Sequence, residues 1–229
     1  MTTEFSDAFL HEAERHAAWG AEQLEALGAF LPEGPWTADL PSCLYRQGGQ
    51  ELRVAVLGTY DEQERSWMWG WANPGLRGTP VVSLAEEAER FGRAHGIGEF
   101  TAGVLDLSGF ADPRRAAETL AFAGMGVTRS PGYIGVPAGP GTLVYFLPDD
   151  PRVPRAALDP VALARTLLAA VGLIGRSPRR LVTGYFDHHG VPVRESGHQV
   201  VAALPGGDAA EVDFDPVGRI VAVRLTAGR

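Results

Sequence analysis

Hydrophobic residues at helical spacing mark the first element of the chain. Apolar positions recur three and four residues apart between Glu4 and Leu27, which predicts an amphipathic helix that ends at Gly28. Three segments with the composition of strands follow, at residues 42–46, 51–60 and 66–72. The middle segment, LRVAVLGTY, is apolar on both faces apart from Arg53, as expected for a central strand of a sheet.

The next part of the chain alternates helix signals with short apolar runs. A second helix is predicted to start at Ser83, which has the spacing of a capping box with Glu86, and to stop at Gly96. Asp112–Pro113 opens a third helix, with aspartate as the cap and proline in the first turn, and this helix ends near Gly124. Further strands are expected at residues 100–107, 127–128 and 142–147, with a loop, SPGYIGVPAGPG, between the last two.

Proline and mixed charge mark a boundary within the chain. The segment PDDPRVPRAALDP, residues 148–160, has the composition of a linker, so we expect a domain at 1–147 and a smaller module at 161–229. In the module, Asp159–Pro160 and Ser177–Pro178 open two helices, and strands follow at 199–204, 209–214 and 219–225. Both parts combine helices with a meander of strands, which predicts an α+β fold with antiparallel sheets and packed helices.

Charge restricts the partners of the protein. The chain has 229 residues and a net charge of −8, and its 20 basic residues are all arginine. These arginines are scattered, whereas a nucleic-acid-binding protein needs clustered positive charge, so we expect no nucleic acid as a partner. The absence of lysine excludes a Schiff base and a phosphate loop that depends on lysine. We expect a small molecule or a protein as the partner, and the oligomeric state stays open.

Cysteine content and hydropathy indicate a cytoplasmic protein, and the use of arginine without lysine, together with many Ala, Gly and Pro residues, is typical of a bacterial source. Cys43 is the only cysteine, so no disulfide can form within the chain, and a small buried residue is a commoner role for it than a nucleophile. The first residues, MTTEFSDAF, are acidic and lack the apolar core of a signal peptide. No stretch approaches the length of apolar sequence that a membrane-spanning helix needs, so we expect no membrane association.

Three tryptophans lie within five residues of the segment SWMWGWANP, residues 66–74. Residues two apart in a strand point to the same face, so Trp67, Trp69 and Trp71 are predicted to form one aromatic row. The row is either part of the core or a binding platform, where indole rings hold a flat, apolar or cationic ligand. On the second interpretation, the candidate ligand-binding residues are Trp67, Trp69, Trp71, Asn73 and Tyr133.

The same segment carries a resemblance to a known family. The run VLGTYDEQERSWMWGWANP, followed by an acidic helix that ends in HGIGEF, resembles an uncharacterised and largely actinobacterial family with the motif W-x-W-[AG]-W-A-N. The similarity covers roughly residues 1–147, and the tryptophan motif is its most specific part. The family has no assigned activity, so the resemblance implies a shared fold without a function. The region after Pro148 resembles an added module.

Histidines supply the candidate catalytic groups. The run HEAERH has its two histidines five residues apart, which does not match the zinc-protease spacing of four, and FDHHG lacks the aspartates of the phosphoesterases that carry a similar run. His16, His95 and His189 lie on or beside apolar helix stripes and would act together only if the fold brings them to one place. For catalysis the candidates are His95, Asp187 and His189, and no metal or cofactor motif is present.

Two hypotheses for function follow from these residues. The first is a non-catalytic binding or accessory protein that uses a tryptophan-lined pocket or surface for a small ligand or a protein partner. The second is an enzyme that acts on an apolar small molecule with an acid–base pair of histidine and aspartate, which leaves no sequence motif. Replacement of the tryptophans should lower affinity in the first case, and replacement of His95 or His189 should abolish turnover in the second.

Overall fold

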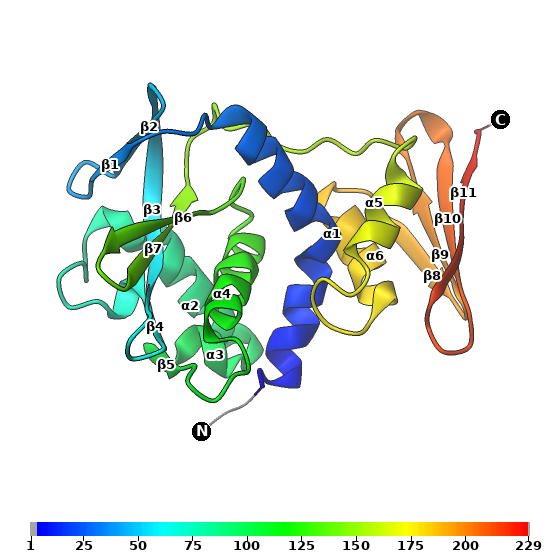
Figure 1. Ribbon diagram of the computed structural model, residues 1–229. Helices are drawn as coiled ribbons and strands as arrows, with labels where there is room; N and C mark the ends of the chain where they lie inside the picture. The colour runs from blue at the N-terminus through cyan, green and yellow to red at the C-terminus, as the bar shows by residue number, and fades with distance from the viewer. Residues whose placement is uncertain (1–3, 229) are drawn as a thin grey trace. The chain divides into compact units, whose positions relative to one another are not determined.

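The computed structural model describes residues 4–228, which divide into two compact units (Figure 1). Unit 1 comprises Met1–Phe9 and Gln23–Arg155, and unit 2 comprises Leu10–Glu22 and Ala156–Arg229. Helix α1, Asp7–Phe30, therefore contributes its ends to unit 1 and its middle to unit 2. It begins where the Ser6 hydroxyl accepts the Phe9 N–H at 3.2 Å, which satisfies a donor that the first turn leaves open.

Within the described residues, unit 1 forms one seven-stranded antiparallel sheet (Figure 1). The long strand β3 is its centre, because it pairs with β2, β4 and β7, while β1 extends β2, β5 extends β4, and β6 extends β7. The predicted α+β class with antiparallel sheets is thereby confirmed. The strands are β1 Trp36–Asp39, β2 Leu44–Gln47, β3 Gln50–Asp61, β4 Ser66–Trp69, β5 Val104–Asp106, β6 Ile134–Gly139 and β7 Thr142–Pro148.

The helices of unit 1 largely follow their sequence signals. Asp112 caps α4 as predicted, because its Oδ1 accepts the Arg115 N–H at 2.9 Å, and Gly96 ends α2 in the left-handed conformation. The predicted capping box at Ser83 is wrong: a 3₁₀ turn runs directly into α2, so Val82 is the cap residue and no side chain caps it. The elements are the 3₁₀ turns Gly70–Ala72 and Pro80–Val82, and the helices α2 Ser83–His95, α3 Gly98–Thr101 and α4 Pro113–Val127.

Several strand predictions in unit 1 need correction. Strand β4 stops at Trp69 rather than at residue 72, and the chain continues as a 3₁₀ turn in which Gly70 packs directly on the Val56 carbonyl of β3. Residues 127–128 are the end of α4, and the predicted strand at 100–107 is α3 followed by the short strand β5. The expected loop SPGYIGVPAGPG contains β6, because its alternate residues Ile134 and Val136 are buried against β7.

Unit 2 combines helices with a four-stranded antiparallel sheet in the order β11-β10-β9-β8. Ser177 caps α6 as predicted, and burial alternates along β10, as expected for a sheet with one covered face. The sequence prediction missed β8, and the helix expected from residue 160 begins only at Leu163. The elements are α5 Leu163–Ala170, α6 Pro178–His188, β8 Val193–Ser196, β9 Gln199–Ala203, a 3₁₀ turn Pro205–Gly207, β10 Ala209–Phe214 and β11 Ile220–Thr226.

Buried polar contacts attach the middle of α1 to the rest of unit 2. The Glu14 carboxylate is 4% exposed and accepts the Ser177 N–H at 3.0 Å, the Arg176 N–H, and the Arg180 guanidinium at 2.6 Å. Gly184 of α6 lies so close to the Arg15 backbone that any side chain there would overlap it. The expected domain boundary at 148–160 contains the point where the two units divide, but Leu10–Glu22 groups with the C-terminal unit.

Candidate functional site

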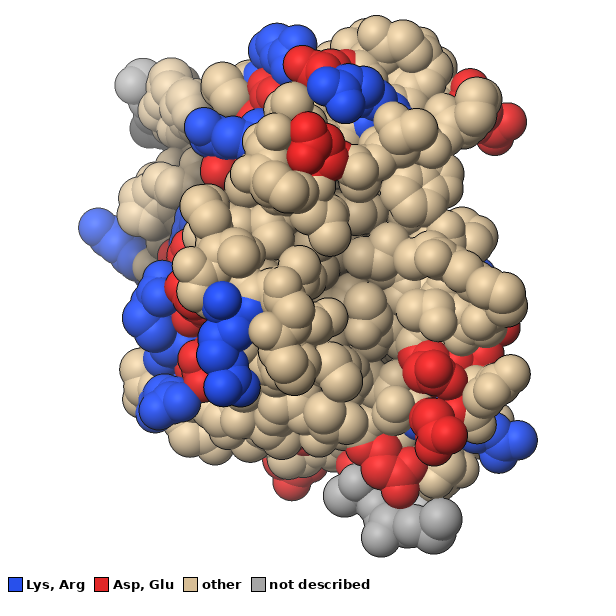
Figure 2. All heavy atoms as spheres, turned by 90° about the vertical axis from the view of Figure 1, so that its left-hand side faces the viewer, with Lys and Arg blue, Asp and Glu red and all other residues tan. Residues whose placement is uncertain are grey.

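The charged surface does not by itself mark a binding face. On the face of the molecule in Figure 2, arginine side chains lie beside carboxylates at the margins, and a broad area without charge lies between them. Among the described helices, none is both long enough and apolar enough to cross a membrane. The candidate sites are therefore the cavities and the clusters of polar side chains.

The tryptophan segment forms part of the core of unit 1. The side chains of Trp67 and Trp69 are 0% exposed, and their rings meet edge to face with centroids 5.2 Å apart. Trp67 also packs on Gly58 of β3, where an added Cβ would lie 2.5 Å from the indole. Trp69 Nε1 donates to the Glu99 carbonyl at 2.8 Å, whereas Trp67 Nε1 has no hydrogen-bond partner among the described residues. Their burial matches the core interpretation of the row.

The remaining three candidate ligand-binding residues lie outside that row. Trp71 follows the end of β4 in a 3₁₀ turn and is half-buried, so the predicted row of three is limited to two rings. Asn73 Oδ1 accepts the Gly75 N–H at 2.9 Å, which makes it part of a turn. Tyr133 packs beside Tyr145 at 6.0 Å between ring centroids, and burial raises the pKa of Tyr133 to about 12.

A cleft of about 530 Å³ lies in unit 1 where the start of β3, the end of α4 and the segment after β7 come together. Three arginines, Arg53, Arg129 and Arg155, contribute to its lining, and we call it the arginine cleft. Its volume is in the range of sites for small molecules. The other lining residues are Leu84, Thr128, Ser130, Pro131, Pro148, Asp149, Asp150, Pro151, Val153 and Pro154.

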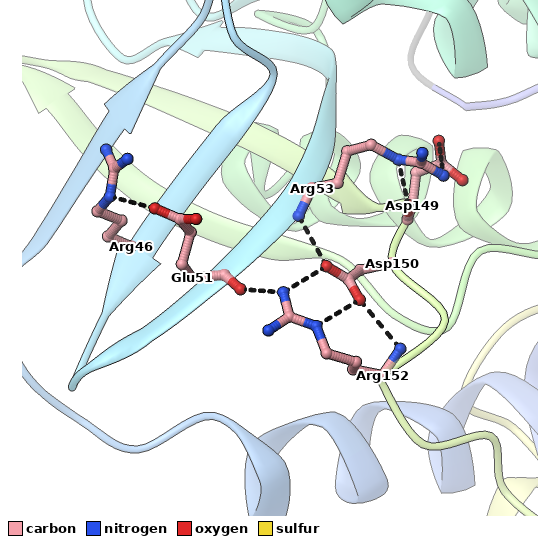
Figure 3. A network of polar contacts seen from close by, with 6 residues as sticks. All are labelled: Arg46, Glu51, Arg53, Asp149, Asp150 and Arg152. Carbon is pink, nitrogen blue, oxygen red and sulfur yellow. Dashed lines mark hydrogen bonds and ion pairs between the residues drawn. The ribbon is translucent and has the colours of Figure 1, made fainter.

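Asp150 fixes the segment that forms one wall of the arginine cleft (Figure 3). Its carboxylate is 7% exposed and accepts the Arg53 N–H at 3.1 Å and the Arg152 N–H at 3.0 Å. The Arg152 guanidinium also donates to both carboxylate oxygens, at 3.0 and 2.7 Å, and to the Glu51 carbonyl. The hydrogen bonds from Arg152 are the main cause that holds the pKa of Asp150 well below its usual range, so the group stays charged.

Arg53 joins the same wall to the central strand (Figure 3). It interrupts the apolar run of β3, and its guanidinium donates to the Asp149 carbonyl at 2.7 Å and pairs with the Asp149 carboxylate at 3.1 Å. The Asp149 N–H in turn donates to the Arg53 carbonyl at 2.9 Å. The loop after β7 therefore holds the Arg53 side chain at the cleft.

Arg129 and Arg155 come from two different segments of the cleft. Arg129 follows α4 with a φ of 51°, and its carbonyl accepts a hydrogen bond from the Arg155 guanidinium at 2.9 Å. Gln23 is fully buried and donates to the carbonyls of Pro131 and Pro154, at 3.2 and 2.8 Å, so it ties these segments together. Among the described residues, no carboxylate pairs with Arg155.

The arginine cleft offers chemistry for an anion. A guanidinium presents a planar set of N–H donors that matches a carboxylate or a phosphate, and it stays charged at every physiological pH. The two aspartates of the lining are already engaged by Arg152 and Arg53. Proline rings contribute apolar surface and reduce the number of backbone donors, because proline has no N–H.

The three candidate catalytic residues are divided between the units. His95 belongs to unit 1, where it is exposed, stacks on Phe91 at 4.0 Å and has Nδ1 at 2.9 Å from the Phe91 carbonyl. Asp187 and His189 belong to unit 2; the Asp187 carboxylate lies 3.7 Å from Arg15 and is half-exposed. Burial lowers the pKa of His189, whose Nε2 lies 4.0 Å from the Glu22 carboxylate.

Unit 2 instead pairs two histidines that sequence reasoning did not connect. His16 Nδ1 and His188 Nε2 share a hydrogen bond of 2.8 Å, and His16 Nε2 lies 3.2 Å from Glu12 Oε1. The His188 ring stacks on Trp19 with centroids 3.9 Å apart. His16 and His188 thus form a pair within unit 2, whereas His95 belongs to unit 1. Within residues 4–228, no three His, Cys, Asp or Glu side chains are grouped so that they could hold a metal ion.

The arginine cleft was missed because its residues lie far apart in the sequence. The signals that could have indicated it were Arg53 in the middle of an apolar strand and the two arginines beside prolines after β7. We had interpreted those prolines as a linker. Proline also fixes the backbone of a well-defined wall, and composition does not distinguish the two roles.

One comparison with known proteins gives a match. Residues 7–151 match a protein family that is described as "Family of unknown function (DUF6882)". The match includes every strand of unit 1 and the tryptophan segment, and it confirms the resemblance to an uncharacterised family. No curated protein and no solved structure matches the chain.

Proposed function

The chain belongs to this family of unknown function, and from its own residues we propose a non-catalytic binding protein that holds a small organic anion in the arginine cleft of unit 1. The proposal keeps the expected binding role but moves the site away from the tryptophans. The observation that carries it is the lining of the cleft, to which three separate segments contribute Arg53, Arg129 and Arg155, while Asp149 and Asp150 are each paired with an arginine.

The rigidity of the cleft supports a binding role. Asp150 is held by Arg152 and by the β3 backbone, and Gln23 joins two of the segments that form the walls. A preformed site loses little conformational entropy when a ligand binds, so more of the contact energy appears as affinity. The same rigidity would place the arginine side chains at fixed distances, which favours one shape of anion over others.

The lining also restricts the class of ligand. Leu84, Val153 and the proline rings provide apolar walls, whereas the charged groups provide donors for a carboxylate or a phosphate. A ligand with an anionic group and a compact apolar body satisfies both. A metal ion or a cationic ligand would face an excess of positive charge and is not supported.

The test is binding of defined anions to the whole protein. Phosphate, succinate and benzoate are titrated by calorimetry against the wild type, Arg155→Gln and Arg90→Gln; Arg90 is an exposed arginine of α2 outside the cleft. We expect Arg155→Gln to weaken the best anion about tenfold or more, since a hydrogen bond to a charged group is worth about 1.5–3 kcal/mol. Arg90→Gln should change affinity less than about twofold.

Two results would contradict the proposal. The first is the absence of binding by all three anions to a protein that is folded by circular dichroism. The second is an equal loss of affinity in Arg155→Gln and Arg90→Gln, which would mean that net charge alone attracts the anion.

A second candidate function, an acid–base enzyme, is favoured by the contacts of His16 in unit 2. The Glu12 carboxylate lies 3.2 Å from His16 Nε2, and His16 Nδ1 shares a hydrogen bond with His188 Nε2. A proton on His16 Nε2 would make His16 Nδ1 the acceptor of that hydrogen bond and would leave His188 Nδ1 to accept a proton from a substrate.

The enzyme proposal is tested with p-nitrophenyl acetate, an ester that reacts with basic imidazoles. We expect hydrolysis by the wild type and by His95→Gln, and its loss in His188→Gln. Equal rates in His188→Gln and the wild type would contradict a catalytic role for the histidine pair. This result leaves the arginine cleft unaffected, because the two proposals share no residue.

A further inference from the structure

A second surface of unit 1 lies beside strand β5, away from the residues of the arginine cleft. A groove of about 360 Å³ follows this strand, and five apolar side chains contribute to its lining. We call it the β5 groove. Its lining residues are Glu4, Phe5, Gly98, Glu99, Ala102, Leu105, Asp106, Leu107 and Phe110, and the arginine cleft uses none of them.

Strand β5 is an edge of the seven-stranded sheet. It pairs with β4 and with no other strand in the described part of the chain. On the paired side, the Trp69 N–H donates to the Gly103 carbonyl at 3.0 Å and the Leu107 N–H donates to the Arg65 carbonyl at 2.8 Å. Because hydrogen bonding alternates along an antiparallel strand, the backbone groups of Val104 and Asp106 face the open side.

The aromatic part of the groove is held by ring packing. The ring of Phe5 lies 4.7 Å from that of Phe110 and 4.6 Å from that of Phe9, which is fully buried. Glu99 fixes the start of α1, because its carboxylate accepts the Ser6 N–H at 2.6 Å and the Ser6 hydroxyl at 2.9 Å. The apolar surface is therefore formed before any partner arrives.

The described lining of the β5 groove is acidic. Glu4, Glu99 and Asp106 contribute carboxylates, and no arginine or histidine is among the lining residues that the structure describes. The hydrogen bonds from Ser108 lower the pKa of Asp106, so this group is charged at neutral pH. An apolar groove with acidic groups along one side is complementary to a segment that carries both apolar and basic side chains.

We propose that the β5 groove binds an extended segment of a partner protein in which apolar and arginine or lysine residues alternate. The segment adds a strand to β5 through the backbone groups of Val104 and Asp106. Its alternate apolar side chains lie beside Leu105 and Phe110, and its basic side chains lie beside Asp106. Strand addition of this kind takes affinity from the backbone and specificity from the pockets for alternate side chains.

Two features of Val104 and Asp106 support this occupant over a small molecule. Val104 is 55% exposed although it lies in a strand, and a neighbouring strand would cover it. Proteins normally protect an edge strand with charge, a bulge or a covering element, because an open edge pairs with other chains. The acidic groups here protect the edge against acidic and neutral strands and leave it open to a basic one.

The experiment uses a fluorescent peptide of three Val-Arg repeats, with a peptide of three Val-Glu repeats as its control. Anisotropy is measured with the wild type, Val104→Pro, Asp106→Arg and Glu87→Arg. Proline at Val104 removes an outward N–H and leaves the β4 pairing intact, so the variant should fold. Glu87 is an exposed residue of α2, and its reversal changes net charge as much as the reversal of Asp106 does.

The expected result is binding of the Val-Arg peptide and no binding of the Val-Glu peptide. Val104→Pro and Asp106→Arg should each weaken binding about tenfold or more, whereas Glu87→Arg should change it less than about twofold. In two-dimensional NMR, the amide signals of Val104 and Asp106 should shift and exchange more slowly with solvent when the peptide is present.

Three outcomes would overturn the proposal. The first is no binding of the Val-Arg peptide to the folded wild type at about 1 mM. The second is unchanged affinity in a folded Val104→Pro, and the third is equal weakening by Glu87→Arg and Asp106→Arg. The last would mean that the peptide responds to net charge rather than to the groove. None of these results bears on the arginine cleft, which contributes no residue to the groove.

Discussion

The tryptophan segment and the segment after β7 differ in how well their composition indicates their role. Residues 66–72 contain three tryptophans and attract attention as a binding surface, yet Trp67 and Trp69 are fully buried. Residues 148–155 contain prolines and mixed charge and have the composition of a linker, yet they form one wall of the largest cleft that we describe. The rare residues form part of the core, and the apparent linker lines the candidate site.

This difference has a physical basis. A tryptophan in a strand buries a large apolar area, and a sheet covered by helices provides the place for it, so the core is the ordinary destination of such a residue. Binding of a charged ligand needs donors that stay in contact with solvent, and exposed segments between elements supply them. The segment after β7 is fixed by Asp150 and Arg152, so it combines exposure with order.

The largest expected effect is a loss of stability when a buried tryptophan of the tryptophan segment is replaced. Trp67→Ala should lower the free energy of unfolding of the protein by about 3–5 kcal/mol, because the ring is fully buried and packs directly on Gly58. The measurement is urea denaturation followed by circular dichroism. Trp71→Ala serves as the matched control, since Trp71 is half-buried, and it should cost clearly less.

An equal loss of unfolding free energy in Trp67→Ala and Trp71→Ala would contradict the assignment of Trp67 to the core and of Trp71 to a half-buried position outside it. A folded Trp67→Ala protein with unchanged stability would go further, because it would make the indole a surface group. Either result would make the tryptophan segment a candidate binding surface again.

Local signals in the sequence predicted two of the helix ends of unit 1, but not the start of α2 at Ser83. Asp112 and Gly96 were assigned correctly because a cap and a stop act over three or four residues. The strand β6 was missed because its proline and glycine content is typical of a loop, and only pairing with β7 makes it a strand. Tertiary contacts decide such segments, and no local pattern reports them.

The candidate site could be predicted less well than the fold. Arg53, Arg129 and Arg155 come together only because β3, the end of α4 and the segment after β7 meet. The same applies to His16 and His188, which are 172 residues apart in the chain. The expected tryptophan row is limited to two rings, because the chain leaves the strand for a 3₁₀ turn before Trp71.

The second largest effect should come from the wall of the cleft. Asp150→Ala should lower the free energy of unfolding by about 1–3 kcal/mol, because it leaves N–H donors of Arg53 and Arg152 without their acceptor. It should also weaken anion binding, because the segment that carries Arg155 is no longer fixed. Unchanged stability and unchanged anion affinity would mean that the wall is ordered by its prolines alone.

The effect of Asp150 should depend on pH in a defined direction. The pKa of Asp150 is lower in the folded protein than in the unfolded chain, so the folded state favours the charged form. Its contribution is complete above the ordinary aspartate pKa of about 3.9 and is lost as the pH falls below that value. The difference in unfolding free energy between the wild type and Asp150→Asn should therefore be larger at pH 7 than at about pH 2.

A smaller effect, that of salt on affinity, should show whether the charged groups or the apolar walls of the arginine cleft hold the anion. If guanidinium groups hold the anion, its affinity should fall several-fold as the salt concentration rises from about 0.05 to about 0.5 M, because salt screens exposed charges. The measurement is calorimetry with the anion that binds best. An affinity independent of salt would assign the binding to the apolar walls, Leu84, Val153 and the prolines.

The smallest effect is expected at His95, which sequence reasoning had placed among the catalytic candidates. His95 is exposed at the end of α2, and its contacts are those of a residue that stacks on its own helix: the Phe91 ring and the Phe91 carbonyl. His95→Gln should change the free energy of unfolding by less than about 0.5 kcal/mol, as exposed substitutions usually do, and should leave anion binding and ester hydrolysis unchanged. The matched comparison is His188→Gln, because His188 shares a hydrogen bond with the buried His16 and stacks on Trp19. If His95→Gln instead abolished an activity that His188→Gln retained, the exposed surface of α2 would become the place to look for the reaction.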